Sequence, residues 1–220
     1  MRVRTGAPRW SGGSGGSSPL LVVAALAVLV LAACGSSPTP EPNLPVPSAP
    51  VVAPSELAAQ KQESGIEDCP RSDPAVAAVP SGLPDLVLGC LGGGRDVRLA
   101  GLRGQPMMIN VWAQWCGPCL DEAPYIGEVA TANESNLMIL GIDYDDPRPD
   151  RAIEFARVST WTFPQLVDQD RALSGPLQIT GPPQTFFVRA DGTIAYRHTG
   201  PFASAVDIRV QAKRHLGVTL

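Results

Sequence analysis

Short apolar runs alternate with amphipathic stretches through the second half of the chain. Residues 107–112 and 137–142 are almost continuously apolar, a pattern typical of strands that are buried on both faces of a sheet. The predicted strands are residues 86–91, 97–99, 107–112, 137–142, 185–188 and 193–197, and the predicted helices are residues 116–131, 150–158 and 204–216. In the last helix, the spacing predicts that Val206, Val210 and Leu216 face inward. Strands that alternate with helices and end in a hairpin predict an α/β three-layer sandwich.

The beginning of the chain has the pattern of an export signal. An apolar run over residues 20–33 follows a leader that contains arginines and no acidic residue. This run is too short for a membrane-spanning helix, which needs roughly 20 residues, and it fits the apolar region of a signal peptide. It ends in Ala32 and Ala33 directly before Cys34, which resembles a bacterial lipobox. The resemblance implies cleavage before Cys34 and a lipid anchor on its sulfur; an ordinary signal peptide with an incidental cysteine is the alternative.

A proline-rich stretch follows the expected cleavage site. Prolines separated by small residues over residues 35–55 favour extended polyproline II backbone of about 3.1 Å per residue. We therefore predict a lipoprotein signal peptide at residues 1–33, a lipid-anchored linker at residues 34–68, and a folded domain at residues 69–220. The formal net charge of the 220-residue chain is −4, which argues against a nucleic-acid-binding surface.

The candidate chemistry lies where a predicted strand meets a predicted helix. Cys116 and Cys119 are three residues apart on the first turn of this helix, which brings their Cα atoms near the roughly 5–6 Å that a disulfide requires. Unpaired N–H groups at a helix N-terminus stabilise a thiolate at Cys116. Cys119, one turn deeper, is expected to be shielded and to react second.

Two sets of potential metal ligands were weighed against this interpretation. A Cys-x-x-Cys pair is also half of a zinc site, but no second pair has ligand spacing, and the two histidines, His198 and His215, lie far along the chain. An acidic cluster formed by Asp143, Asp145 and Asp146 lacks the spacing of a calcium loop and is expected to cap a strand end and the next helix. We expect no metal and no cofactor other than the Cys116–Cys119 disulfide.

The string from Trp115 to Cys119, followed by Pro124, resembles the thioredoxin superfamily. The resemblance implies a thioredoxin-like three-layer sandwich with a mixed central sheet, here with an added N-terminal β-hairpin. Residues 181–186 resemble the cis-proline segment of that superfamily, which places a cis bond before Pro183. The residues expected to contact substrate are Trp115, Gly117, Pro118, Pro182 and Pro183. Pro182 departs from the family pattern because it has no N–H to donate, so substrate pairing there would use its carbonyl alone.

The leading hairpin, an insertion around residues 147–159 and Glu122 make the chain most similar, within the superfamily, to the membrane-tethered group of TlpA, ResA and CcmG-like proteins. Asn110 stands where cytosolic thioredoxins carry a buried aspartate that moves protons for the inner cysteine. Because asparagine cannot ionise, the resemblance assigns proton acceptance to Glu122, which lies on the same helix face as Cys119. An ordinary acid in the first helical turns, with no role in proton transfer, is the alternative for Glu122.

The five cysteines can then be assigned. Once Cys34 and the Cys116–Cys119 pair are accounted for, Cys69 and Cys90 remain and are expected to form a structural disulfide, as exported domains often do. Closing a loop of about 20 residues contributes roughly 3 kcal/mol in the chain-entropy model. A second redox centre is the alternative for this pair.

The resemblance implies a tethered thiol–disulfide oxidoreductase on the outer face of the cytoplasmic membrane. A reductant is favoured, supplied with electrons by a transmembrane thiol carrier of the CcdA or DsbD type, with exported proteins such as apocytochrome c as clients. The alternatives are a disulfide-forming oxidase fed by a quinone-linked partner and a non-catalytic binding lipoprotein. Peroxide reduction is disfavoured because Ala113 stands where peroxiredoxin-like sites carry threonine.

Overall fold

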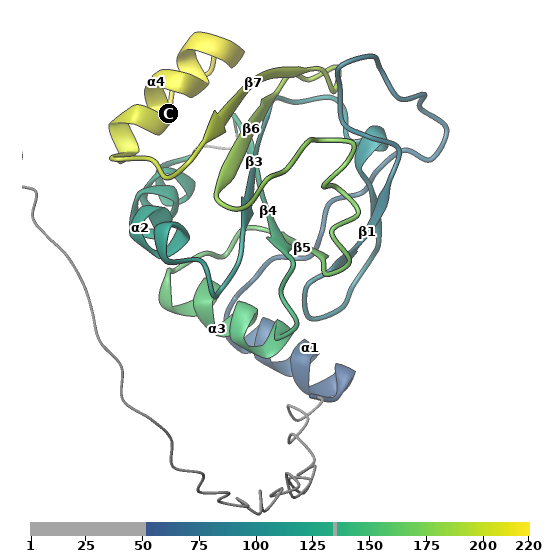
Figure 1. The fold of residues 1–220 in the computed structure, drawn as a ribbon, viewed down its shortest axis with the longest axis vertical. Helices are drawn as coiled ribbons and strands as arrows, with labels where there is room; N and C mark the ends of the chain where they lie inside the picture. Colours follow the sequence, from purple (N-terminus) through teal and green to yellow (C-terminus); the bar gives the residue numbers. More distant parts are fainter. Residues whose placement is uncertain (1–51, 134–135) are drawn as a thin grey trace, which may run out of the picture. The chain divides into compact units, whose positions relative to one another are not determined.

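The computed structural model describes residues 52–133 and 136–220, so the predicted signal peptide and Cys34 lie outside the described residues. Seven strands form one mixed sheet in the order β2-β1-β5-β4-β3-β6-β7 (Figure 1). The strands are β1 (Val87–Cys90), β2 (Val97–Arg98), β3 (Met107–Trp112), β4 (Met138–Tyr144), β5 (Gln165–Asp168), β6 (Gln184–Val188) and β7 (Ile194–Thr199). The helices are α1 (Pro54–Glu63), α2 (Gly117–Ala132), α3 (Pro149–Val158) and α4 (Ala205–Leu216), with the 3-10 turn η1 (Leu99–Gly101). The predicted thioredoxin-like α/β fold is confirmed.

Strand β3 occupies the interior of the sheet. It pairs parallel with β4 and antiparallel with β6, and all six of its residues are buried. Because side chains alternate along a strand, Met108 and Trp112 point into one apolar core while Ile109 and Val111 point into the other. This double burial explains why the predicted strand is a nearly continuous apolar run.

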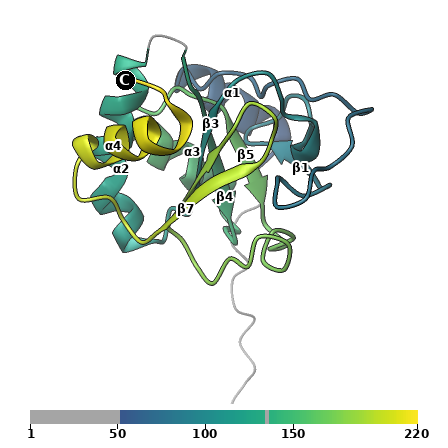
Figure 2. The ribbon, with the colours of Figure 1, turned by 90° about the horizontal axis from the view of Figure 1, so that it is seen from above.

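Helices α2, α3 and α4 lie along one face of the sheet (Figure 2). The core on this face is centred on Trp112, whose ring stacks on Phe155 of α3 at 4.7 Å and meets Trp161 edge-on at 5.3 Å. Aromatic pairs in these geometries contribute about 0.5–1.5 kcal/mol beyond their buried area. Helix α2 contacts these aromatic residues, because Trp161 Nε1 donates to the Ala123 carbonyl at 3.0 Å.

The other face of the sheet is covered mainly by segments without long helices. Leu83, Leu99, Leu173 and Ile179 pack there against the strands. Strand β1 joins this region to the sheet, since it pairs antiparallel with both β2 and β5. No helix among the described residues is both long and apolar enough to span a bilayer.

The linker predicted over residues 34–68 differs from the structure, because α1 lies within it. Pro54 occupies the first turn of this helix, where a missing N–H costs no hydrogen bond, and good helix formers follow. Helix α1 packs beside α3 (Figure 1). Its Leu57 contacts the core on that side. The helix was not predicted, because the prolines over residues 35–55 favour an extended linker.

Two further details of the sequence interpretation need correction. The predicted inward positions on α4 are wrong for Val206 and Val210, which are 62% and 51% exposed, whereas Ile208 and Ala212 are buried. The prediction is confirmed for Leu216, which is half-buried and packs against the core. Strand β5 was not predicted, because its four residues, including Gln165 and Asp168, lack an apolar pattern.

We predict that Gly141→Ala destabilises the fold by roughly 1–3 kcal/mol. A Cβ at this position of β4 would collide with Oε1 of Gln165, the atom that accepts the hydrogen bond from Trp112 Nε1 at 2.9 Å. Urea unfolding measures the loss. Gly89→Ala on β1 is the matched control, since its Cβ meets only ordinary contacts, and equal midpoints for the two variants would contradict the argument.

Candidate active site

Cys116 and Cys119 form a disulfide at the N-terminus of α2, directly after β3 and a short loop. Their Cα atoms are 5.2 Å apart, as the spacing predicts. Cys116 is the N-cap residue of α2, and its sulfur accepts the Cys119 backbone N–H at 3.2 Å. Cys119 is fully buried, whereas Cys116 is 5% exposed. The deeper position of Cys119 is confirmed, and Cys116 in this disulfide is also largely enclosed.

An exposed rim surrounds the disulfide. Trp115, Gly117 and Pro118 are all exposed, and so is Leu120 on the next turn of α2. The Trp115 indole N–H donates to the carbonyl of Asp145 at 3.0 Å, which fixes the ring over the adjoining loop. This rim offers an apolar surface next to the sulfur atoms.

The Pro182–Pro183 peptide bond is cis, as predicted. Its position follows from the sheet register, in which Val111 of β3 pairs with Gln184 of β6. Pro183 therefore lies level with the end of β3, where the loop to Cys116 begins. Pro182 is half-buried and Pro183 is buried.

Glu122 is a buried carboxyl group that joins three parts of the fold. Its Oε1 accepts a hydrogen bond from Asn110 Nδ2 on β3 at 2.9 Å, and its Oε2 accepts the Phe202 backbone N–H at 3.0 Å. Asn110 Nδ2 also lies 3.1 Å from Thr185 Oγ1 on β6. Burial raises the pKa of Glu122 to about 7, although the two hydrogen bonds oppose the shift. The side chain therefore changes charge in the neutral pH range, one helical turn from Cys119.

The acidic cluster after β4 supports the active-site loop. Asp146 is buried, with one carboxylate oxygen accepting the Gln114 backbone N–H and the other the Arg148 backbone N–H, both at 3.0 Å. Asp146 thus holds the loop before Cys116 and the turn before α3, but the predicted side-chain cap on α3 is absent, because the side chain of its N-cap residue, Arg148, makes no capping hydrogen bond. Burial, and then the neighbouring Asp146 charge, raise the pKa of Asp143 well above its usual value. The capping role predicted for Asp143 is wrong, because its side chain is buried and neither carboxylate oxygen has a hydrogen-bond partner among the described residues.

The predicted disulfide between Cys69 and Cys90 is confirmed, with a Cα–Cα distance of 5.9 Å. It ties the segment after α1 to the end of β1. In the part of the chain that the structure describes, no three histidine, cysteine or acidic side chains are grouped as metal ligands would be.

Comparison with known proteins agrees with this geometry. Residues 81–197 match the AhpC/TSA family. Over 99 residues the chain is 35% identical to the thiol:disulfide interchange protein DsbE of Vibrio cholerae, a match that covers 44% of this chain and 52% of that protein. DsbE of Escherichia coli K12 is 31% identical over 98 residues, with 44% and 51% covered. The chain thus spans about half the length of the curated relatives it matches.

A solved structure shows the likeness over a longer part of this chain. MTB DsbF, in mixed oxidised and reduced forms, is 26% identical with a TM-score of 0.53, and the match covers 62% of this chain and 98% of DsbF. The matched region includes β3, the Cys116–Cys119 disulfide, Glu122 and the cis-proline. The chain therefore belongs to the AhpC/TSA family and has a thioredoxin-like domain.

Proposed function

We propose that this chain is an extracytoplasmic thiol–disulfide oxidoreductase that acts on cysteines of exported proteins. The observation that carries the proposal is the Cys116–Cys119 disulfide at the N-terminus of α2, with the buried Glu122 carboxyl on the next turn of the same helix. A dithiol in this setting exchanges two electrons without a cofactor. The name of the relatives, thiol:disulfide interchange protein, supports the same reaction class.

In the proposed mechanism, the Cys116 thiolate attacks one sulfur of a substrate disulfide and displaces the other as a thiolate. The N-terminus of α2 stabilises negative charge on Cys116, whose sulfur accepts the Cys119 backbone N–H. Cys119 then attacks Cys116 in the mixed disulfide and releases the reduced substrate. The two electrons gained by the substrate are those lost when Cys116 and Cys119 join. Trp115, Gly117, Pro118, Pro182 and Pro183 are proposed to hold the substrate chain.

Glu122 is proposed to accept the proton that Cys119 loses before it attacks. A carboxyl group with a pKa of about 7 is matched to this task near neutral pH. Asn110 orients it, because an amide donates to the carboxyl group without adding a second negative charge. Glu122 on α2 thereby takes the proton-accepting role, because Asn110 on β3 cannot ionise.

The direction and the clients are proposed from the resemblance to TlpA, ResA and CcmG-like proteins. We propose a reductant that receives electrons from a CcdA- or DsbD-type membrane carrier and acts in cytochrome c maturation on apocytochrome c. A lipid anchor at Cys34 would hold it to the outer face of the cytoplasmic membrane.

Cys119→Ser is expected to accumulate mixed disulfides with client proteins, because the resolving thiol is gone while the attacking one remains. Non-reducing gels and mass spectrometry detect and identify the adducts. Cys116→Ser is the matched control and should trap few. If both variants trap equally, or neither traps anything, the assigned order of the cysteines is wrong; adducts without any c-type apocytochrome would remove the maturation role.

Glu122→Gln is expected to slow resolution of the mixed disulfide roughly tenfold or more at pH 7, because no group remains to accept the Cys119 proton. Stopped-flow measurement across pH 5–9 should show a wild-type transition near pH 7 that the variant lacks. Asp121→Asn, on the exposed side of the same turn, is the control and should match wild type.

Glu122→Gln should also change how the free energy of unfolding depends on pH. Since the folded-state pKa of Glu122 lies above its unfolded value, the stabilising contribution of its protonated form is complete below about pH 4.5 and is lost as pH rises through about 7. The difference in unfolding free energy between variant and wild type should therefore change by about 3 kcal/mol across this window. A constant difference, together with an unchanged rate profile, would return Glu122 to a purely structural role.

Cys34→Ala is expected to release the processed protein from membranes or to leave the precursor uncleaved. Fractionation with detection of attached lipid by mass spectrometry measures this. If the variant is processed and still fractionates with membranes, the lipoprotein proposal fails.

A further inference from the structure

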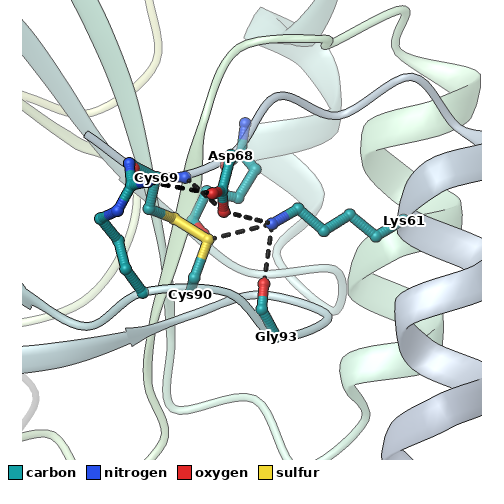
Figure 3. A network of polar contacts seen from close by, with 7 residues as sticks. Lys61, Asp68, Cys69, Cys90 and Gly93 are labelled. Carbon is teal, nitrogen blue, oxygen red and sulfur yellow. Dashed lines mark hydrogen bonds and ion pairs between the residues drawn. A yellow bond between two sulfur atoms is a disulfide. The ribbon is translucent and has the colours of Figure 1, made fainter. Parts of the chain in front are cut away.

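The Cys69–Cys90 disulfide lies against a buried lysine from α1. The Lys61 side chain extends from the helix to the disulfide, and its Nζ lies 3.2 Å from Cys90 Sγ (Figure 3). The same ammonium donates to the Gly93 carbonyl at 2.8 Å and lies 3.4 Å from Asp68 Oδ1. Lys61 is only 8% exposed, so its charge has little access to water.

The charge of Lys61 is incompletely balanced in the disulfide form. Among the described residues, its one acidic partner is Asp68, whose side chain is 54% exposed. Asp68 is shared with Arg95, whose guanidinium lies 3.6 Å from the other carboxylate oxygen. The sulfur of a disulfide is neutral and a weak acceptor. A buried cation that faces such an acceptor is less stable than one that faces an anion.

The two sulfur atoms have different surroundings. Cys69 Sγ lies 3.3 Å from the carbonyl oxygen of Gln165, which can accept a hydrogen bond from a thiol but would repel a thiolate. Cys90 Sγ faces the Lys61 ammonium instead. Once reduced, this pair is therefore best accommodated as a Cys69 thiol and a Cys90 thiolate, and both environments improve on reduction.

We propose that Cys69–Cys90 is a second redox-active couple, whose reduced form is stabilised by an ion pair between the Cys90 thiolate and Lys61. An external dithiol supplies two electrons and becomes a disulfide while the Cys69–Cys90 bond breaks. Of the two protons that the dithiol loses, one passes to Cys69 and the other is released to solvent. The proposal uses neither Cys116 nor Cys119 and stands apart from the function proposed above.

Both sulfur atoms are buried, so exchange requires a local opening of the chain around α1. Rates will therefore report that opening, whereas the position of equilibrium reports the Lys61 contact. Thermodynamic linkage also requires that whatever Lys61 adds to the stability of the reduced pair, the Cys90 thiolate adds to the docking of Lys61.

The test is a redox equilibrium of the full chain in buffers of reduced and oxidised dithiothreitol at pH 8, followed by differential alkylation and peptide mapping of Cys69 and Cys90. An opposite charge within about 4–6 Å stabilises an ionised group by roughly 1–3 pKa units, so Lys61→Met should require roughly tenfold more reduced dithiothreitol for half-reduction. Lys213→Met, at the other lysine of the chain, is the control and should match wild type. Lys61→Arg, which keeps the charge, should remain close to wild type.

Circular dichroism and urea midpoints of the oxidised proteins establish that each variant is folded. Peptide mapping follows the Cys116–Cys119 pair separately, so its behaviour does not affect the result. Coincident titrations of Lys61→Met and Lys213→Met would overturn the proposal. So would a Cys69–Cys90 pair that stays oxidised in every buffer after long equilibration, since the disulfide would then be structural only.

Discussion

The double burial of β3 is the constraint on which the rest of the structure depends. This strand is hydrogen-bonded on both edges and packed on both faces, so neither its register nor its tilt can change without disturbing both cores. The loop to Cys116 begins at the end of β3. Asp146, which follows β4, accepts the Gln114 backbone N–H and so holds this loop in place. The candidate site therefore lies at the end of a strand that is paired on both edges and buried on both faces, although its rim is exposed.

The hydrogen-bonded side chains of Asn110 and Glu122 form a polar contact within the apolar core beside β3. Asn110 occupies the helix-facing side of β3 among large hydrophobic residues, and it is tolerated because its amide donates to Glu122 and lies beside Thr185. A second ionisable acid at position 110 would place two negative charges in contact. The asparagine instead donates a hydrogen bond to a single carboxyl group, whose pKa burial raises to about 7.

Features that depend on a short stretch of sequence could be predicted, whereas contacts between residues far apart in the sequence could not. The redox pair, β3, α2 and the cis-proline follow from short strings, and the Cys69–Cys90 bridge follows once the other cysteines are assigned. In contrast, Glu122 meets Phe202 across 80 residues and Lys61 meets Cys90 across 29. No local pattern encodes such contacts. Helix α1 was not predicted because it begins in a proline-rich stretch that favours an extended chain. Strand β5 was not predicted because its residues are buried by packing against other elements and not marked by an apolar pattern of their own.

The Cys69–Cys90 bridge also determines how mechanical load would enter this domain. Tension applied to the chain ahead of α1 acts first on that helix, whose hold on the domain includes Leu57 and Lys61. Beyond Cys69, the covalent bridge diverts the force into the end of β1, near the margin of the sheet, and bypasses residues 70–89. Pulling would thus peel away one helix and then load a strand three positions from β3, leaving the Cys116–Cys119 site shielded from the strain.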